Sequence, residues 1–467
     1  MTSPALIDRT TELTELQVQW NAVEGGAARL VVVYGRRQVG KTFLLSHFLE
    51  RVRATGVTSV FASGFGSASE RQQLAGLAES LRRDLPEAAG LVPVSFSAWA
   101  DALQWLVALA RTRPVLAVLD EVPWLVESTP TLPSLLQQAW DRIRMDGRPP
   151  RLLLVLCGSA VATMRRLLGG TGALYGRADR ELQILPFDLP TAASVLSRSE
   201  PEQVIEAYAA CGGYPLHLAA WDEDASTEDN LLRLAATSGS LLLRSGQRLL
   251  TDIPHEGGYR RVLHAIGSGA DVRAAIGRLA DQRTERPLDL LLRTTLVRHR
   301  RPLGAPDRTP GRYEIADAYL RFWYDQLWAD EELIEGGQGK QILARRRGRW
   351  ERHLGWVFEE QAREHAVRLA QSGTLPSSAV YGPWWATRGP QAEIDVLGLV
   401  GRRTVMVGEA KWDRRPLHSR EFAYLMERAK HAPDPVSDLV VAFWSRGGLS
   451  SQMHGALGFT PADMVRK

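Results

Sequence analysis

The segment VVVYGRRQVGKTFLL, residues 31–45, constrains the fold more than any other part of this sequence. An apolar strand-like run leads into the spacing G-x-x-x-x-G-K-[ST], and a helical pattern follows it. Glycines at these positions let backbone N–H groups wrap around phosphates, and the helix N-terminus adds partial positive charge. Lys41 is expected to reach the β- and γ-phosphates of ATP, and Thr42 to ligate Mg²⁺. The predicted nucleotide-binding residues of this loop are Gly35, Arg36, Arg37, Gln38, Val39, Gly40, Lys41 and Thr42.

Continuous apolar runs in the first third of the chain predict strands that are buried on both faces, as in parallel sheets. Helix-length segments separate these runs, which indicates a doubly covered α/β domain from residue 1 to about residue 188. The predicted strands are RLVVVY (29–34), SVFASG (59–64), PVLAVLD (114–120), RLLLVLC (151–157) and ELQILPF (181–187).

Polar residues end two of these runs and are candidates for catalysis. Asp120 and Glu121 follow a buried strand, where Asp120 would hold Mg²⁺ and Glu121 would polarise the attacking water. Ser159 ends the next strand beside the expected γ-phosphate. The alternative is that these residues cap the helices that follow them. Arg177, or its neighbour Arg180, could supply charge to the transition state in cis or on another subunit, or could be a solvated surface residue.

The remaining two-thirds of the chain divides into three predicted parts. Residues 189–255 are expected to be helical, with no convincing strand. Residues 256–340 contain three short helices and a hairpin, the plan of a winged helix-turn-helix, followed by an aromatic helix and a polar joint, ADEELIEGGQGKQ. This part is expected to contact DNA phosphates or to dock a protein partner. The arginines available for phosphate contact are Arg260, Arg261, Arg273, Arg278, Arg293, Arg298, Arg300 and Arg301. Residues 341–467 are a further α/β segment that begins with the basic run ARRRGRW.

Several spaced motifs resemble the archaeal-type ATPase family, a prokaryotic branch of the P-loop ATPases of the AAA+/STAND kind. The resemblance covers nearly the whole chain and implies an ATPase core, a helical lid, a winged helix and a C-terminal nuclease-like domain. It also implies that Arg9 lies near the adenine. Gln38 departs from the family pattern, in which arginine is common. The motifs are LIDRTTELTELQVQW, YGRRQVGKTFLL, LDEVPWL, LCGSAVATM, YGR…LPF, CGGYPLHL and YEIADAYLRFWY.

A second candidate site lies in QAEIDVLGLVGRRTVMVGEAKWD. Two strands flank a turn, so that pairing could bring Asp395 beside Glu409, and Lys411 shares a strand face with Glu409. Two carboxylates that meet this way are stable when protonated or when they share a cation such as Mg²⁺ or Mn²⁺. Lys411 would then orient a hydroxide or stabilise charge on a phosphodiester. The alternative is an exposed cross-strand ion pair.

This pattern resembles the PD-(D/E)xK nuclease superfamily. The resemblance assigns the helical metal-binding carboxylate to Glu359, with Glu360 as the rival, and the site to Glu359, Asp395, Glu409 and Lys411. The proline that names the motif is absent, because Glu393 and Ile394 precede Asp395.

Composition adds a few limits. A net charge of +4 with a pI near 9.1 permits nucleic-acid binding without demanding it. Only five of the 57 basic residues are lysine, and Lys41 and Lys411 are two of them. No signal peptide or apolar run long enough to cross a membrane is visible, and the two cysteines cannot form a disulfide framework. These features predict a cytoplasmic protein without membrane contact.

The sequence therefore predicts an ATPase coupled to DNA binding and metal-dependent DNA cleavage, with ATP and Mg²⁺ as cofactors, Mn²⁺ as an option at the second site, and homo-oligomerisation as an option. The alternative is a nucleotide-dependent STAND-type switch with a non-catalytic C-terminal scaffold.

Overall fold

The computed structural model describes residues 8–251, 253, 257–387 and 389–466. Leu6 and Ile7 of the motif LIDRTTEL therefore lie outside the described residues. The chain divides into two compact units, Met1–Leu185 and Pro186–Lys467. None of the helices in the described ranges combines the length and the apolar composition needed to cross a bilayer.

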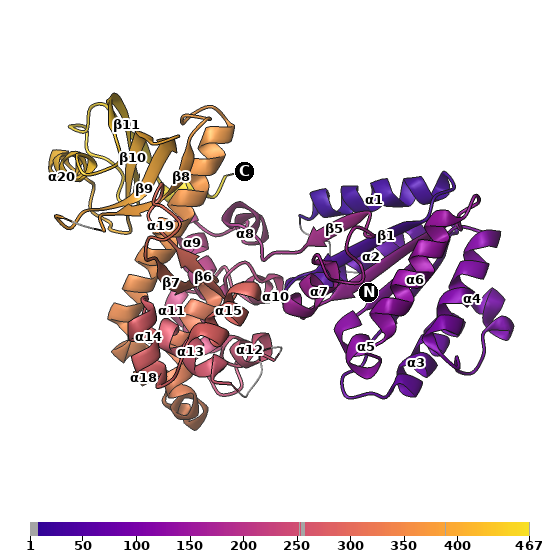
Figure 1. Ribbon diagram of the computed structural model, residues 1–467. Helices are drawn as coiled ribbons and strands as arrows, with labels where there is room; N and C mark the ends of the chain where they lie inside the picture. Colours follow the sequence, from indigo (N-terminus) through magenta and orange to yellow (C-terminus); the bar gives the residue numbers. More distant parts are fainter. Residues whose placement is uncertain (1–7, 252, 254–256, 388, 467) are drawn as a thin grey trace. The chain divides into compact units, whose positions relative to one another are not determined.

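The first unit is built on a five-stranded parallel sheet with the order β2-β3-β4-β1-β5. The first four predicted runs form β1 to β4 to within one residue, and every residue of β3 and β4 is buried. The fifth prediction, 181–187, is too long, because β5 ends at Gln183. Helices cover both faces of the sheet (Figure 1). The strands are β1 (Arg29–Tyr34), β2 (Thr58–Ser63), β3 (Val115–Asp120), β4 (Leu152–Gly158) and β5 (Arg180–Gln183). The helices are α1 (Thr10–Glu24), α2 (Lys41–Arg53), α3 (Glu70–Asp84), α4 (Trp99–Thr112), α5 (Val122–Ser128), α6 (Leu132–Met145) and α7 (Val161–Leu168).

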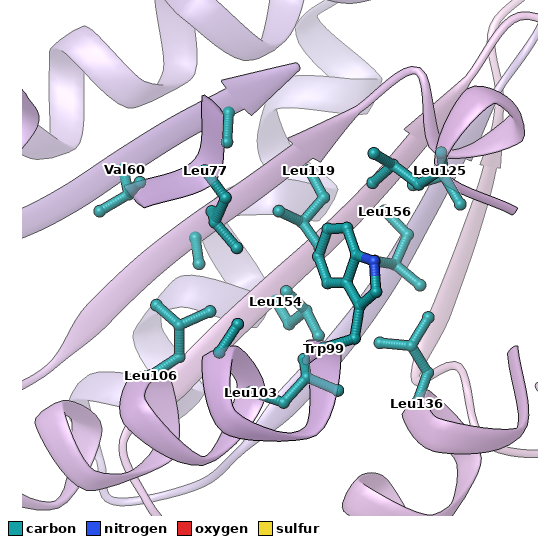
Figure 2. Close-up of a cluster of buried hydrophobic side chains, with 14 of the residues drawn as sticks. Val60, Leu77, Trp99, Leu103, Leu106, Leu119, Leu125, Leu136, Leu154 and Leu156 are labelled. Carbon is teal, nitrogen blue, oxygen red and sulfur yellow. The ribbon is translucent and has the colours of Figure 1, made fainter. Parts of the chain in front are cut away.

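One face of this sheet carries a large apolar core. Figure 2 shows Trp99 of α4 among leucine side chains of the sheet and the neighbouring helices. Trp99 is 1% exposed. Each leucine buried around it contributes about 1.5–3 kcal/mol to the free energy of folding. A core of this size fixes the strands against one another and thereby fixes the loops at their ends. Other labelled members are Val60, Leu77, Leu103, Leu106, Leu119, Leu125, Leu136, Leu154 and Leu156.

The strand order determines which loops meet. Because β4 lies between β1 and β3, the carboxyl ends of these three parallel strands are neighbours at one edge of the sheet. The glycine loop follows β1, Asp120 and Glu121 stand at the end of β3, and Ser159 follows β4. The sequence motifs are therefore gathered at the crevice where α/β sheets bind ligands.

The second unit begins with helices and ends with a mixed sheet. Three helices are followed by an antiparallel pair of short strands, as the sequence predicts for residues 259–315. The helices up to this point are α8 (Leu189–Val195), α9 (Pro201–Cys211), α10 (Pro215–Ala219), α11 (Thr227–Ala235), α12 (Leu241–Leu249), α13 (Tyr259–Gly267), α14 (Arg273–Ala280) and α15 (Glu285–Arg293). The paired strands are β6 (Val297–Arg300) and β7 (Arg312–Ile315).

The segment ADEELIEGGQGKQ, predicted as a polar joint, is instead largely helical. α16 (Ala318–Phe322) continues through π- and 3₁₀-turns into α17 (Glu331–Leu333), and a further π-turn, broken at Gly337 with φ 86°, leads to α18 (Gly339–Arg345). Tertiary packing explains the difference. Ile334 is fully buried, and a Cβ at Gly339 would lie 1.7 Å from the backbone oxygen of Ala236. The polar composition therefore describes only the exposed face of a packed segment.

The C-terminal sheet has the order β12-β11-β10-β9-β8, in which β8, β9 and β10 are antiparallel and β10, β11 and β12 are parallel. The long helix α19 (Arg347–Gln371) contacts β8, β9 and β10. The strands are β8 (Val380–Trp385), β9 (Glu393–Val400), β10 (Arg403–Lys411), β11 (Pro435–Ser445) and β12 (Ala456–Phe459), and the remaining helices are α20 (Ser419–Ala429) and α21 (Pro461–Met464).

A buried histidine joins α19 to α9 and makes stability sensitive to acid. Nε2 of His353 donates to the backbone oxygen of Ala209 at 2.8 Å, and burial lowers the pKa of His353 to about 3. Below about pH 6.5 the unfolded chain binds a proton that the folded chain excludes, so the free energy of unfolding falls as pH drops from about 6.5 toward 3. We expect His353→Gln to flatten this decline in urea titrations, whereas the exposed His454→Gln should leave it unchanged. Parallel pH profiles for wild type and His353→Gln would contradict this assignment.

Candidate active sites

Two positions of the glycine loop favour glycine for physical reasons. A Cβ at Gly35 would lie 2.2 Å from the backbone oxygen of Ile184, so no side chain fits there. Gly40 has φ 92°, and Gln38 has the left-handed value of 66°. Lys41 begins α2, is 5% exposed and donates from Nζ to the backbone oxygen of Arg36 at 2.8 Å. Burial lowers the pKa of Lys41, while the nearby carboxylates of Asp120 and Glu121 and the Cys157 thiol oppose that shift.

The magnesium residues predicted for this loop meet directly. The Thr42 hydroxyl donates to Oδ2 of Asp120 at 2.8 Å, and the Asp120 carboxylate is 3% exposed. Oδ1 of Asp120 accepts the backbone N–H of Glu121 at 2.9 Å. A hydroxyl and a carboxylate that converge at the start of a helix are oxygen donors of the kind that Mg²⁺ prefers.

The backbone of Glu121 also adopts an unusual conformation. It has φ 50° and ψ 44°, a left-handed conformation that is uncommon outside glycine. Its Oε1 accepts the Ser159 hydroxyl at 2.6 Å. Neither residue caps a helix through its side chain: α5 has no side-chain cap bond, and the N-cap of α7 is Ala160. The alternative of simple helix capping is therefore not what the geometry shows.

Arg9 ties the chain before α1 to the glycine loop. Its Nη2 donates to the backbone oxygens of Val39 at 3.0 Å and Leu185 at 2.8 Å, and Nη1 pairs with Glu12 at 3.0 Å. Arg9 has φ 94°, so its backbone also adopts a left-handed conformation. Arg37 lies over the ring of Trp124 in α5, 5.8 Å from the ring centroid. These contacts connect α1 and α5 with the loop.

The two arginines proposed for the transition state are ion-paired within the first unit. Arg177 makes two bonds to Asp141 of α6, at 2.8 and 2.9 Å, and Arg180 pairs with Glu15 of α1 at 3.0 Å. The Asp141 hydrogen bond raises the pKa of Arg177. Action on phosphate remains a prediction for either residue.

The second site assembles as the hairpin pattern predicts. Val407 pairs with Leu397 and Gly408 with Val396, so the next position along each strand places Glu409 beside Asp395. The backbone N–H of Ala410 donates to Oδ2 of Asp395 at 2.9 Å. Lys411 Nζ lies 2.7 Å from Oε1 of Glu409, whose side chain is buried. A solvated cross-strand pair does not describe this arrangement, because its carboxylate is withdrawn from solvent.

The structure distinguishes the two rival glutamates of α19. Burial, and then the nearby charge of Asp395, raise the pKa of Glu359 to about 8. Arg363, Arg298 and Arg300 instead hold the pKa of Glu360 at about 2. Burial also raises the pKa of Asp395. Glu359 and Asp395 are thus neighbouring, half-buried carboxyl groups, an arrangement that a shared cation stabilises.

Arg428 of α20 is a site residue that sequence reasoning missed. It bonds to Oε2 of Glu409 and donates from Nη1 to the backbone oxygen of Glu393 at 3.1 Å. Two cations of the chain, Lys411 and Arg428, therefore engage Glu409, while Glu359 and Asp395 form the carboxyl pair. Within the described residues, no three His, Cys, Asp or Glu side chains are already arranged as a metal cage. No local signal marks Arg428, because packing of α20 brings it there.

Several arginines predicted to face DNA bind acidic side chains instead. Arg300 lies 2.5 Å from Glu314 and 2.6 Å from Glu360, and Arg298 bonds to the same two carboxylates. Arg301 pairs with Asp307 at 3.0 Å. The sequence could not reveal this, because Glu360 lies sixty positions further along the chain than Arg300. Arg298 and Arg300 hold the β6–β7 pair against α19 and are therefore not free to bind phosphate.

Two parts of the chain are similar to known protein families. Residues 6–220 match a family described as an ATPase domain predominantly from Archaea, and residues 323–424 match a family of archaeal and bacterial proteins of unknown function. An uncharacterized protein of Methanocaldococcus jannaschii is 23% identical over 426 residues, which covers 87% of each chain. An uncharacterized ATP-binding protein of the same organism is 46% identical over 44 residues, 9% of this chain and 70% of that protein.

Solved structures are similar at low identity. The ORC2 protein of Aeropyrum pernix, in its ADPNP–ADP complexes, is 16% identical with a TM-score of 0.46 and covers 73% of this chain and 96% of its own. The ORC1 protein of the same organism, in complex with DNA, is 14% identical with a TM-score of 0.35 and covers 73% and 95%.

Proposed function

We propose, from the premise that residues 6–220 belong to the family of ATPase domains found predominantly in Archaea, that this chain binds and hydrolyses ATP with Mg²⁺ and thereby controls a C-terminal domain that binds and cuts DNA. The observation that carries the first half is the convergence of the glycine loop, Lys41, and the bond between Thr42 and Asp120 at the carboxyl edge of the sheet. In this proposal the chain has four domains: an ATPase domain (1–188), a helical lid (189–255), a winged-helix domain (256–340) and a nuclease-like domain (341–467).

Each residue of the first site has a distinct part in this proposal. The loop from Gly35 to Gly40 offers backbone N–H groups, and Lys41 offers an ammonium group, to the phosphates. Thr42 and Asp120 would hold Mg²⁺, which supplies charge neutralisation at the transferred phosphate. Glu121 would orient the attacking water, and Ser159 fixes the Glu121 carboxylate through their 2.6 Å bond. Arg9 would stand near the adenine.

Glu121→Gln tests the hydrolytic assignment. The amide can still accept the Ser159 hydroxyl but no longer polarises water, so we expect ATP hydrolysis to fall about 100-fold or more while ATP affinity stays within about twofold. Phosphate release and binding of a fluorescent ATP analogue measure the two quantities. Glu127→Gln, an exposed change on α5, is the matched control. Hydrolysis at the wild-type rate in Glu121→Gln would remove this residue from the mechanism.

The second half of the proposal assigns metal-dependent cleavage of a phosphodiester to the C-terminal site. It is supported by the raised pKa of Glu359 beside Asp395 and by the buried Glu409 carboxylate at 2.7 Å from Lys411. Glu359, Asp395 and Glu409 would hold Mg²⁺ or Mn²⁺, which supplies a Lewis acid and an activated water. For a metal ion to bind there, the Glu409 carboxylate must release Lys411 or Arg428. Lys411 would then stabilise the charge that develops on the phosphate.

The helices α13 to α15 and the β6–β7 pair support a winged helix-turn-helix, whose partner is DNA or a protein. A nucleotide-dependent switch with a non-catalytic C-terminal scaffold is the other candidate, and the engagement of Glu409 by Lys411 and Arg428 favours it. Such a switch would bind its partner with different affinities in ATP and ADP and would leave plasmid DNA intact. Arg177 or Arg180 acting on a neighbouring copy would require a homo-oligomer.

A further inference from the structure

An open pocket of about 820 Å³ lies in the second unit beside the start of β9. Its walls come from the segment that joins β6 to β7 and from the residues at the end of β8. Two guanidinium groups, an indole and two prolines line it, contributed by Arg308, Arg312, Trp385, Pro306 and Pro310. Positive charge combined with an aromatic ring is the chemistry that binds single-stranded nucleic acid, because every base presents a stacking face and every nucleotide a phosphate.

Trp385 is held in place for such a contact. The guanidinium carbon of Arg312 lies 4.4 Å from the centroid of the Trp385 ring, a cation–π contact, and Nη1 of Arg312 lies 3.0 Å from Oε1 of Glu393. Glu393 is also the residue opposite Trp385 in the β8–β9 ladder. Arg308 is exposed and, among the described residues, has no ion-pair partner. The pocket therefore offers an oriented ring and a cation with no competing carboxylate.

The pocket adjoins the carboxylate site along a single strand. Asp395 follows Glu393 by two residues on β9, so the two side chains share a strand face and their Cα atoms are about 6–7 Å apart. Arg428 donates to the backbone oxygen of Glu393 at 3.1 Å and bonds to Glu409, whose other partner is Lys411. Arg428 therefore contacts both the strand that borders the pocket and the carboxylate site.

We propose that this pocket is a subsite for single-stranded nucleic acid, in which one unpaired base stacks on Trp385, whose ring Arg312 orients, while Arg308 holds the adjoining phosphate. A base inside a duplex presents no free face to the indole, so the pocket selects single strands. The inference deepens the cleavage function proposed above and rests on it for the strand's path toward Asp395. Binding at the pocket requires neither metal nor ATP.

Fluorescence anisotropy of a labelled oligothymidine of about 12 nucleotides, in EDTA and without nucleotide, tests the subsite on the full chain. We expect Trp385→Ala to weaken binding about 5- to 100-fold and Trp385→Phe to retain most of the affinity, because phenylalanine keeps a stacking face. Arg308→Ala should weaken binding and reduce the salt slope of log K by about one. Arg403→Ala, whose arginine pairs with Asp434 at the opposite end of β10, should bind like the wild type.

Unchanged oligothymidine affinity in both Trp385→Ala and Arg308→Ala overturns the subsite, as does an equal loss of duplex affinity. Trp385→Phe and Arg308→Ala decide the matter if thermal melting shows that Trp385→Ala is unfolded. The two proposals fail separately. A protein that needs Trp385 for oligothymidine but never nicks plasmid keeps the subsite and loses the cleavage function. A protein that nicks plasmid yet binds oligothymidine without Trp385 loses the subsite alone.

Discussion

Replacing Lys41 with alanine is expected to reduce ATP hydrolysis at least about 100-fold, as measured by phosphate release. Lys41 is the charged side chain of the glycine loop that would face the β- and γ-phosphates, and removal of one preorganised charge from such a site typically costs 10²- to 10³-fold in rate. The fold should survive, because burial lowers the pKa of this ammonium and its loss removes a desolvated charge. The melting temperature checks that expectation.

Lys340→Ala is the matched control for Lys41→Ala. Lys340 is an exposed lysine of α18 in the second unit and should have no effect on hydrolysis. Because lysine is scarce in this chain, the two variants compare chemically identical changes against an otherwise arginine-rich background. A Lys41→Ala protein that hydrolyses ATP at the wild-type rate would refute the nucleotide site.

Replacing Lys411 with alanine is expected to reduce plasmid nicking in Mg²⁺ or Mn²⁺ at least about 100-fold while ATP hydrolysis stays unchanged. Lys411 is the cation that stands 2.7 Å from Glu409, and its ammonium would stabilise charge on the phosphate as the bond to the leaving oxygen breaks. Glu409→Gln should give the same loss, because the amide is a poor ligand for Mg²⁺.

Lys430→Ala provides the control for Lys411→Ala, since Lys430 pairs with Glu427 on the exposed surface of α20. Together with Lys41→Ala, the experiment shows whether the chain has two active sites. Loss of hydrolysis in one variant and of nicking in the other would establish both. Absence of nicking in the wild type, or equal nicking by Lys411→Ala, would end the cleavage proposal and leave the nucleotide-dependent switch.

The first site was predictable because its determinants are local. Lys41 and Thr42 are specified by the glycine spacing, and Asp120 by its place at the end of an apolar run. Since parallel strands bring their carboxyl ends together, the bond between Thr42 and Asp120 follows from the strand order. The left-handed backbone of Glu121 and the bond from Ser159 were not predictable, because both depend on side-chain packing at the sheet edge.

The second site was predictable only in part. Alternation along β9 and β10 is a local property, and it correctly placed Asp395 beside Glu409. The choice between Glu359 and Glu360 depends on which arginines lie opposite α19, and the partnership of Arg428 with Glu409 depends on the packing of α20. Both are contacts between segments far apart in sequence. The same limitation explains why Arg300 was expected at DNA rather than at Glu360.

The strand order of the first unit also governs how the protein can be made. β1 is synthesised before the other four strands, yet its neighbours in the sheet are β4 and β5, residues 152–158 and 180–183. A nascent chain therefore carries an unpaired strand with five consecutive buried-type residues, Leu30 to Tyr34, until nearly all of residues 1–185 have left the ribosome. Such late, long-range pairing slows folding and leaves aggregation-prone apolar strands exposed. We therefore expect truncations that end before residue 183 to aggregate instead of yielding a smaller soluble domain.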